Sequence, residues 1–299
     1  MEQLKDILVR GTAWGGKIRV FAARTTELVS ELQRRHQTLP TATAALGRTA
    51  SAGAIMGAML KGEEKLTVQV KGDGPIGQIV VDANAHGEVR GYVDNPSVLL
   101  PSNALGKIDV SGGVGREGYL NIIKDLGLKD PYRGSVPLIS GELGEDFTYY
   151  FAVSEQTPSA VGLGVLVDED GSVLQAGGFI VQVMPGLSDE EITRLEQAVG
   201  AMPNVSALLD QGETPEEILH WIVGDDLVIH DTMDIVFQCK CSQERVAQTI
   251  ISLGESEIQQ IIKDDGKAEV VCHFCNEAYT FDRDQLGQLL DQARPKPIQ

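Results

Sequence analysis

The chain reads Gln238-Cys239-Lys240-Cys241 and, beyond residues 242–271, Cys272-His273-Phe274-Cys275, and these two segments decide how its C-terminal part folds. They hold all 4 cysteines of the 299 residues. In a cytosolic protein, such close pairs indicate a metal site before they indicate disulfides. Zn²⁺ suits four soft thiolates arranged as a tetrahedron. The sequence therefore predicts one Zn²⁺ per chain, bound by Cys239, Cys241, Cys272 and Cys275.

The spacing of the first pair also allows redox chemistry. Cys239 and Cys241 are separated by one residue, so in an extended segment both sulfurs lie on the same side of the backbone. A disulfide between them would close a small strained ring, and strained disulfides are the labile, regulatory kind. Lys240 lies between the two cysteines and would favour their thiolate forms if its charge stays close to them.

The number of sulfur ligands limits what the metal can do. A site closed by four cysteines leaves no open position for hydrolytic catalysis, so we expect no enzyme activity. His273 lies inside the second pair, and a site of three cysteines and this histidine is the alternative. Because four thiolates already satisfy Zn²⁺, we expect His273 to face solvent in a turn.

The energy of metal binding predicts a switch. A structural zinc contributes roughly 10–16 kcal/mol to the folding of a small module, whereas a whole domain is stable by about 5–15 kcal/mol. Loss of the metal should therefore unfold the cysteine module, and a segment docked beside it should unfold too.

Composition and charge argue against several classes of function. Hydrophobic residues make up 42% of the chain and charged residues 23%, which is typical of a globular protein. The net charge of −18 repels phosphate backbones, so we expect no nucleic-acid partner. The N-terminus lacks a signal-peptide pattern, and the apolar run Ala52–Leu60 is about half the ~18 residues of a membrane helix. We expect a cytoplasmic protein with no membrane partner.

Residues 1–185 mix strand and helix signals without a regular βαβ period, which predicts an α+β core domain. The expected strands are 17–23, 66–70, 78–82, 89–93, 119–123, 135–139, 160–167 and 172–184. The expected helices are 26–36, 41–60 and 143–154. The helix 41–60 is rich in Ala, Gly, Ser and Thr, so it should pack very closely against its neighbours.

Residues 186–231 predict a helical linker. Capping boxes at Ser188–Glu191 and Thr214–Glu217 each begin a helix. Apolar residues at helical spacing follow them, namely Ile192, Leu195, Val199 and Met202, and then Ile218, Trp221 and Ile222. Helices this short are marginal unless they dock on another surface. We expect the linker to cover apolar core surface, and residues 232–299 to form the small zinc-binding domain.

One glycine pattern suggests a nucleotide site. Gly113, Gly115 and Gly118 match GxGxxG, the dinucleotide-binding fingerprint. That fingerprint requires a strand before it and a helix opening inside it. Strand-like residues follow the glycines here, so we expect a glycine-rich turn between strands.

Taken together, the chain resembles the heat shock protein 33 family of redox-regulated holdase chaperones. The similarity extends over nearly the whole sequence. Its strongest part is the CxC pair followed by the CxxC pair. Further matching segments are Arg24–Thr26, Gly47–Thr49, Met56–Gly57, Met59–Leu60, Gly91–Pro96 and Gly177–Pro185.

The resemblance implies a reduced, zinc-bound and inactive state. It implies that oxidation pairs Cys239 with Cys241 and Cys272 with Cys275, that zinc leaves, and that the linker unfolds. The active protein would hold unfolding client proteins without ATP during oxidative and heat stress, as a homodimer. Two other functions remain open from the residues alone. A zinc-ribbon module for nucleic acid conflicts with the charge, and a thiol-disulfide oxidoreductase needs its CxxC at a helix N-terminus.

Overall fold

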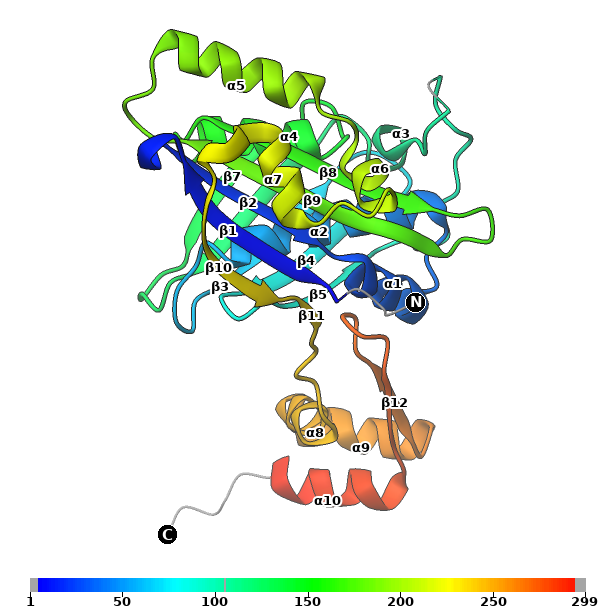
Figure 1. Cartoon of the computed structure of the whole chain (residues 1–299). Coiled ribbons are helices and arrows are strands. Elements are labelled where there is room, and N and C mark those ends of the chain that lie inside the picture. Colours follow the sequence, from blue (N-terminus) through cyan, green and yellow to red (C-terminus); the bar gives the residue numbers. More distant parts are fainter. Residues whose placement is uncertain (1–4, 105, 294–299) are drawn as a thin grey trace. The chain divides into compact units, whose positions relative to one another are not determined.

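The computed structural model describes residues 5–104 and 106–293 and confirms the predicted α+β class (Figure 1). The chain divides after Gln238 into two compact units, Met1–Gln238 and Cys239–Gln299. The segment 186–231 lies within the first of these units. None of the helices in the described ranges is long and apolar enough to cross a membrane.

The first unit contains two sheets. A five-stranded antiparallel sheet has the order β10-β1-β2-β9-β8. Its strands are β1 (Ile7–Ala13), β2 (Ile18–Arg24), β8 (Ser159–Val167), β9 (Val173–Val183) and β10 (Val228–Asp234). A six-stranded sheet has the order β11-β5-β4-β3-β6-β7, and β11 pairs with β5 in parallel. Its strands are β3 (Lys65–Lys71), β4 (Gln78–Asn84), β5 (Glu88–Val93), β6 (Tyr119–Asp125), β7 (Tyr132–Pro137) and β11 (Val236–Phe237).

The small-residue helix α2 (Pro40–Gly57) is buried along nearly its whole length and contacts strands of both sheets. A Cβ atom at Gly53 would lie 2.9 Å from Val81 Cγ1, and one at Gly57 would lie 2.7 Å from the Asn84 carbonyl oxygen. The predicted close packing is confirmed, because larger side chains would push the helix away from the sheet. The other core helices are α1 (Thr26–His36), α3 (Val110–Val114) and α4 (Gly144–Val153), with a 3-10 turn at Trp14–Gly16.

After β9 the chain forms three helices; the second and third cover the outer face of the five-stranded sheet, and the first packs against the third (Figure 1). They are α5 (Asp189–Ala201), α6 (Val205–Asp210) and α7 (Pro215–Val223), followed by the 3-10 turn Gly224–Asp226. The two predicted capping boxes are present, at Ser188 and Thr214. These helices and the five-stranded sheet bury an apolar cluster between them. It includes Val20, Ala22, Phe179, Val181, Leu195, Leu208, Leu209, Ile218, Leu219 and Ile222.

The prediction that Trp221 belongs to the buried apolar face of its helix is wrong. The Trp221 side chain is 53% exposed, while Leu219 and Val223 beside it are buried. The helix turns Ile218, Leu219, Ile222 and Val223 toward the sheet, and this i, i+1, i+4, i+5 face leaves Trp221 outside it.

The glycine pattern at Gly113–Gly118 is not a nucleotide site in this fold. α3 ends at Val114, Gly115 follows with φ +88°, and β6 begins at Tyr119. The order is therefore helix, turn, strand, the reverse of the fingerprint. The Asp73 carboxylate accepts the backbone N–H groups of Arg116 and Glu117 at 3.0 and 3.1 Å, so the protein itself uses the loop's donors.

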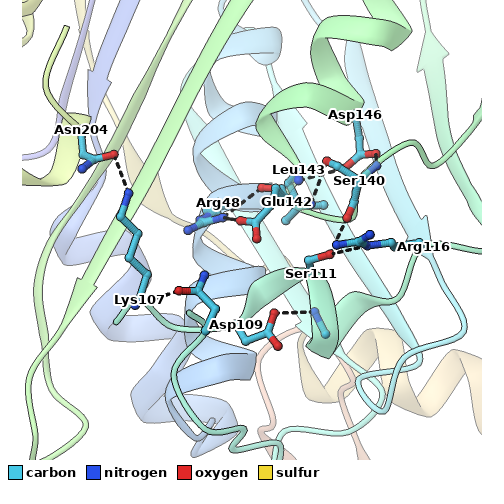
Figure 2. A network of polar contacts seen from close by, with 12 residues as sticks. Arg48, Lys107, Asp109, Ser111, Arg116, Ser140, Glu142, Leu143, Asp146 and Asn204 are labelled. Atoms are coloured by element: carbon cyan, nitrogen blue, oxygen red, sulfur yellow. Dashed lines mark hydrogen bonds and ion pairs between the residues drawn. The ribbon is translucent and has the colours of Figure 1, made fainter. Parts of the chain in front are cut away.

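A polar network fixes the loop that enters α4 (Figure 2). The buried Asp146 carboxylate accepts backbone N–H groups from Ile139, Ser140 and Leu143 at 2.7, 3.1 and 2.9 Å. Leu143 has φ +73°, so the loop holds a non-glycine residue in a disfavoured conformation. Arg48 of α2 donates to the Glu142 carboxylate at 2.8 Å and to its carbonyl at 3.0 Å.

Asp146→Ala is expected to lower the free energy of unfolding by about 3 kcal/mol or more. The substitution leaves three backbone donors without their acceptor at a buried site, and each such loss costs about 1–3 kcal/mol. Urea unfolding measures the effect. Asp146→Asn keeps one oxygen acceptor and should lose clearly less; equal losses would show that the hydrogen bonds are not what matters.

A second buried carboxyl gives a pH dependence. Asp6 is 2% exposed and accepts the backbone N–H groups of Glu27 and Leu28 at the start of α1. Burial raises the pKa of this carboxyl from 3.8 to about 6, against the lowering by the two hydrogen bonds. Folding therefore takes up a proton between about pH 4 and 6. The stabilisation by Asp6 is full below the unfolded pKa and is lost as the pH rises through 6.

Relative to Asp6→Asn, the wild type should thus gain about 1 kcal/mol of unfolding free energy between pH 7 and pH 5. Urea titrations of both proteins at the two pH values measure this difference of differences, and the variant cancels the contributions of the other carboxyls. A difference that stays constant, or that changes in favour of the variant at pH 5, would contradict the assignment.

The second unit is small. It contains α8 (Gln243–Ser252), α9 (Glu255–Asp264), the hairpin β12 (Ala268–Val271) and β13 (Ala278–Phe281), and α10 (Arg283–Ala293). Its apolar cluster of buried residues is Val246, Ile250, Ile258, Phe281, Leu286 and Leu289. A core of this size gives little stability by itself, so the unit needs a further cross-link such as a metal.

Candidate metal centre

The four cysteine sulfurs come together in the second unit. The four Sγ atoms all lie within 4.8 Å of one another, and they belong to Cys239, Cys241, Cys272 and Cys275. Three of the sulfur–sulfur separations are 3.2 Å between Cys241 and Cys275, 3.5 Å between Cys239 and Cys241, and 3.8 Å between Cys239 and Cys272. Sulfurs around a tetrahedral Zn²⁺ at about 2.3 Å would be about 3.8 Å apart. The donor set and its spacing fit this metal.

Two backbone segments carry the ligands. Cys239 and Cys241 lie in the extended segment before α8, and the Ser242 Oγ caps this helix by accepting the Arg245 N–H. The Arg245 guanidinium donates to the Lys240 carbonyl at 2.8 Å, which ties the segment to α8.

Cys272 and Cys275 lie in the turn between β12 and β13. The Cys272 N–H donates to the Glu277 carbonyl, and the Asn276 N–H donates to the Cys272 carbonyl. Asn276 adopts φ +57°, a left-handed conformation that asparagine tolerates better than most residues. The turn therefore directs both sulfurs to one side, as in a zinc knuckle.

Burial controls the chemistry of the thiols. It raises the pKa of Cys241 and, more strongly, that of Cys275. At Cys241 the lowering of the pKa comes from hydrogen bonds with Tyr279 and Cys275, whereas the lowering expected from Lys240 is not among the causes of the shift. Buried thiols of this kind stay protonated until a cation neutralises the thiolate form. The site thus favours binding of a metal cation over the reactivity of isolated thiolates.

The predicted position of His273 is confirmed. The residue is exposed in the turn, and the potential ligand group found among the described residues consists of the four cysteines. His273 is thus not part of the cluster, and the alternative of three cysteines and a histidine has no support in the geometry.

Comparison with known proteins places the chain in a family. The family model described as Hsp33 protein matches residues 6–282. The chain belongs to the Hsp33 family. The 33 kDa chaperonin of Geobacillus kaustophilus is 56% identical over 97% of this chain and 99% of its own length. The 33 kDa chaperonin of Bacillus cereus is 53% identical over 96% and 99% of the two chains.

A solved structure agrees with this assignment. The crystal structure of the 33 kDa chaperonin (heat shock protein 33 homologue) of Thermotoga maritima has a TM-score of 0.91 at 39% identity, covering 97% of this chain and 99% of that one. The chain is therefore an Hsp33-type chaperone with a clustered four-cysteine site, as its cysteine pattern predicted.

Sequence reasoning missed one residue of this Hsp33 site. The Tyr279 hydroxyl of β13 lies 3.1 Å from Cys241 Sγ and donates to it, and this hydrogen bond raises the pKa of Tyr279. The same bond lowers the pKa of Cys241, against the effect of burial. The only sequence signal is the alternation of β13, which places Tyr279 and Phe281 on the inner side of the hairpin.

Tyr279→Phe is expected to weaken zinc binding by about 10-fold, the lower end of losses seen when a hydrogen bond to a metal ligand is removed. The variant keeps the ring but removes the donor that stabilises the Cys241 thiolate. Competition with a chromogenic chelator measures the affinity. Thr280→Ala, on the other side of the same strand, serves as control, and an unchanged affinity in Tyr279→Phe would assign the hydroxyl no role.

Proposed function

We propose that this chain is a redox-regulated, ATP-independent holdase that is inactive when reduced and active after oxidation of its four cysteines. The single observation that carries the proposal is the gathering of all four sulfurs within 4.8 Å, in a small unit of an Hsp33-type chaperone. Bound Zn²⁺ would cross-link the two ligand segments and supply the stability that the small apolar core lacks.

The proposed oxidation uses two pairs of sulfurs. Cys239 pairs with Cys241, and Cys272 pairs with Cys275. Each pair of thiols loses two electrons to one hydrogen peroxide molecule, so that 2 R–SH + H₂O₂ gives R–S–S–R + 2 H₂O. Pairing within each segment leaves the segments unconnected. The alternative bond between Cys241 and Cys275, whose sulfurs lie 3.2 Å apart, would join the two segments and keep the unit closed.

The proposed client surface is the outer face of the five-stranded sheet. α6 and α7 cover Val20 of β2 and Phe179 of β9 there. These helices are short and marginal without packing partners, so we propose that they unfold when the cysteine unit opens. Exposed apolar surface of this kind would hold unfolding proteins without nucleotide hydrolysis.

One set of measurements tests this function. Zinc content, thiol number and suppression of client aggregation are followed before and after peroxide and mild heat, with peptide mapping of the disulfides. We expect zinc release, loss of four thiols and onset of protection together. Protection by the reduced, zinc-loaded protein equal to that of the oxidised one would overturn the redox switch. Sedimentation tests the proposed homodimer of the active form, and fractionation tests the proposed cytoplasmic location.

A further inference from the structure

Residues 228–237, here called the edge segment, connect the edges of the two core sheets (Figure 1). Its first part, β10, pairs antiparallel with β1 at the edge of the five-stranded sheet. Its second part, β11, pairs in parallel with β5 at the edge of the six-stranded sheet. The edge segment therefore occupies the backbone donors and acceptors of two strands that would otherwise be open edges.

The edge segment is held weakly compared with the helices before it. Most β10 side chains are exposed, and Val228 is 55% exposed. Its polar side-chain contacts to β1 include the Arg10–Asp231 ion pair at 2.8 Å and the Thr12–His230 hydrogen bond at 2.8 Å, both exposed. Exposed pairs of this kind contribute about 0–1 kcal/mol each.

The helices before the segment are held differently. The Trp14 indole donates to the Val223 carbonyl at the end of α7 in a buried hydrogen bond of 3.0 Å. Leu208, Ile218 and Leu219 are fully buried. Among the side chains of the edge segment, that of Ile235 is buried, with 4% exposure. Detachment of β10 therefore breaks backbone hydrogen bonds but uncovers little of its own apolar surface, unlike detachment of α6 or α7.

Glycine in β1 allows β10 to approach. A Cβ atom at Gly11 would lie 2.5 Å from the Val228 carbonyl oxygen, and the three nearest atoms all belong to β10. Gly11 lies where the register of the two strands shifts, between Arg10 and Gly11. The close approach of β10 to β1 therefore requires a residue without a side chain at position 11.

The strand beneath β10 is suited to bind another strand. β1 reads Ile-Leu-Val-Arg-Gly-Thr-Ala and contains no proline. The edge strand β7, in contrast, contains Pro137, a residue type that typically protects an exposed edge. Ile229 packs on the outer apolar cluster and Met233 on the inner one. A replacement strand with apolar side chains at these places would contact both clusters.

We propose that the β1 edge is a client-binding surface, to which an extended apolar segment of a non-native protein adds as a strand in place of β10. This inference rests on the proposed holdase function. Backbone hydrogen bonds carry most of such binding and are blind to sequence, which suits a protein that holds many clients. The Gln238 N–H donates to the Val89 carbonyl, and Cys239 follows directly, so the edge segment ends where the cysteine unit begins in the chain.

A covalent lock tests the proposal in the full-length protein. Arg10 and Asp231 lie opposite each other in the register, so the variant Arg10→Cys/Asp231→Cys can join β10 to β1 on peroxide treatment, with the lock verified by mass spectrometry. Arg10→Ser/Asp231→Ser is the matched control without the bond. We expect the locked protein to lose zinc normally and to need at least about five times more chaperone for equal suppression of client aggregation.

Equal protection by the locked protein and its serine control would overturn the proposal while the holdase function stands. Failure of oxidised wild type to protect any client would instead overturn the proposed function. The two failures are therefore distinguishable in one experiment.

Gly11→Ala gives an independent arm that needs no added cysteine. The new Cβ should displace β10, so that amide exchange in residues 228–234 rises and the reduced, zinc-loaded protein already protects clients. Gly287→Ala, whose Cβ meets no atom within 4 Å, is the control. Faster exchange in β10 without any gain in client binding would also overturn the proposal.

Discussion

Serine at position 239 is expected to lower zinc affinity by about 100-fold or more and to leave the Cys239–Gln299 unit largely unfolded. A structural zinc contributes roughly 10–16 kcal/mol, so one of four ligands represents about 3 kcal/mol. That loss equals about two orders of magnitude in affinity. The apolar cluster of this unit is too small to compensate. Chelator competition and the amide exchange of residues 239–293 measure the two effects.

His273→Ala is the matched control for this substitution. It changes a residue in the turn that carries Cys272 and Cys275 but leaves all four sulfurs in place, and His273 is exposed. Zinc affinity and protection of the unit should therefore remain at wild-type values. Full-strength zinc binding by Cys239→Ser, or fewer than four sulfur neighbours in X-ray absorption of the wild type, would contradict four-cysteine ligation.

A fragment ending at residue 185 is expected to fold and to hold clients without peroxide. It retains α2 and the strands β1–β9, which pack around that helix. It lacks α5–α7, so the apolar outer face around Val20 and Phe179 becomes exposed. Suppression of aggregation should need about 10-fold less fragment than reduced full-length protein. Circular dichroism and a client aggregation assay measure folding and holding.

Point variants of the fragment show which surface is responsible. Phe179→Ser removes a side chain that is 3% exposed under the helices and should weaken holding, whereas Leu174→Ser, at 40% exposure on the same strand, should not. A disordered spectrum would contradict the predicted boundary at 185. A folded fragment without holding activity would contradict the outer sheet face as a client surface.

Several features of this protein could be predicted from residues that are close together in the sequence. The helix 26–36 was predicted with the bounds that the structure has, and both capping boxes begin helices where Ser188 and Thr214 indicated. The paired cysteines predicted the cluster because ligands close in sequence need only a turn or an extended segment to face one another. Helix starts and cysteine pairs depend on the spacing of residues a few positions apart, and this spacing can be read from the sequence.

The elements that sequence reasoning missed are those whose structure depends on distant partners. β10 is a polar, exposed strand with weak alternation, and it exists because it pairs with β1 more than 200 residues earlier. α6 is a single short helix, stabilised by burying Leu208 and Leu209 against the sheet. The exposure of Trp221 and the bond from Tyr279 to Cys241 were decided in the same way. The sequence by itself determined the ligands and the local helices, whereas tertiary packing decided the strand edges and buried faces, because their free energy comes from contacts between segments far apart in the chain.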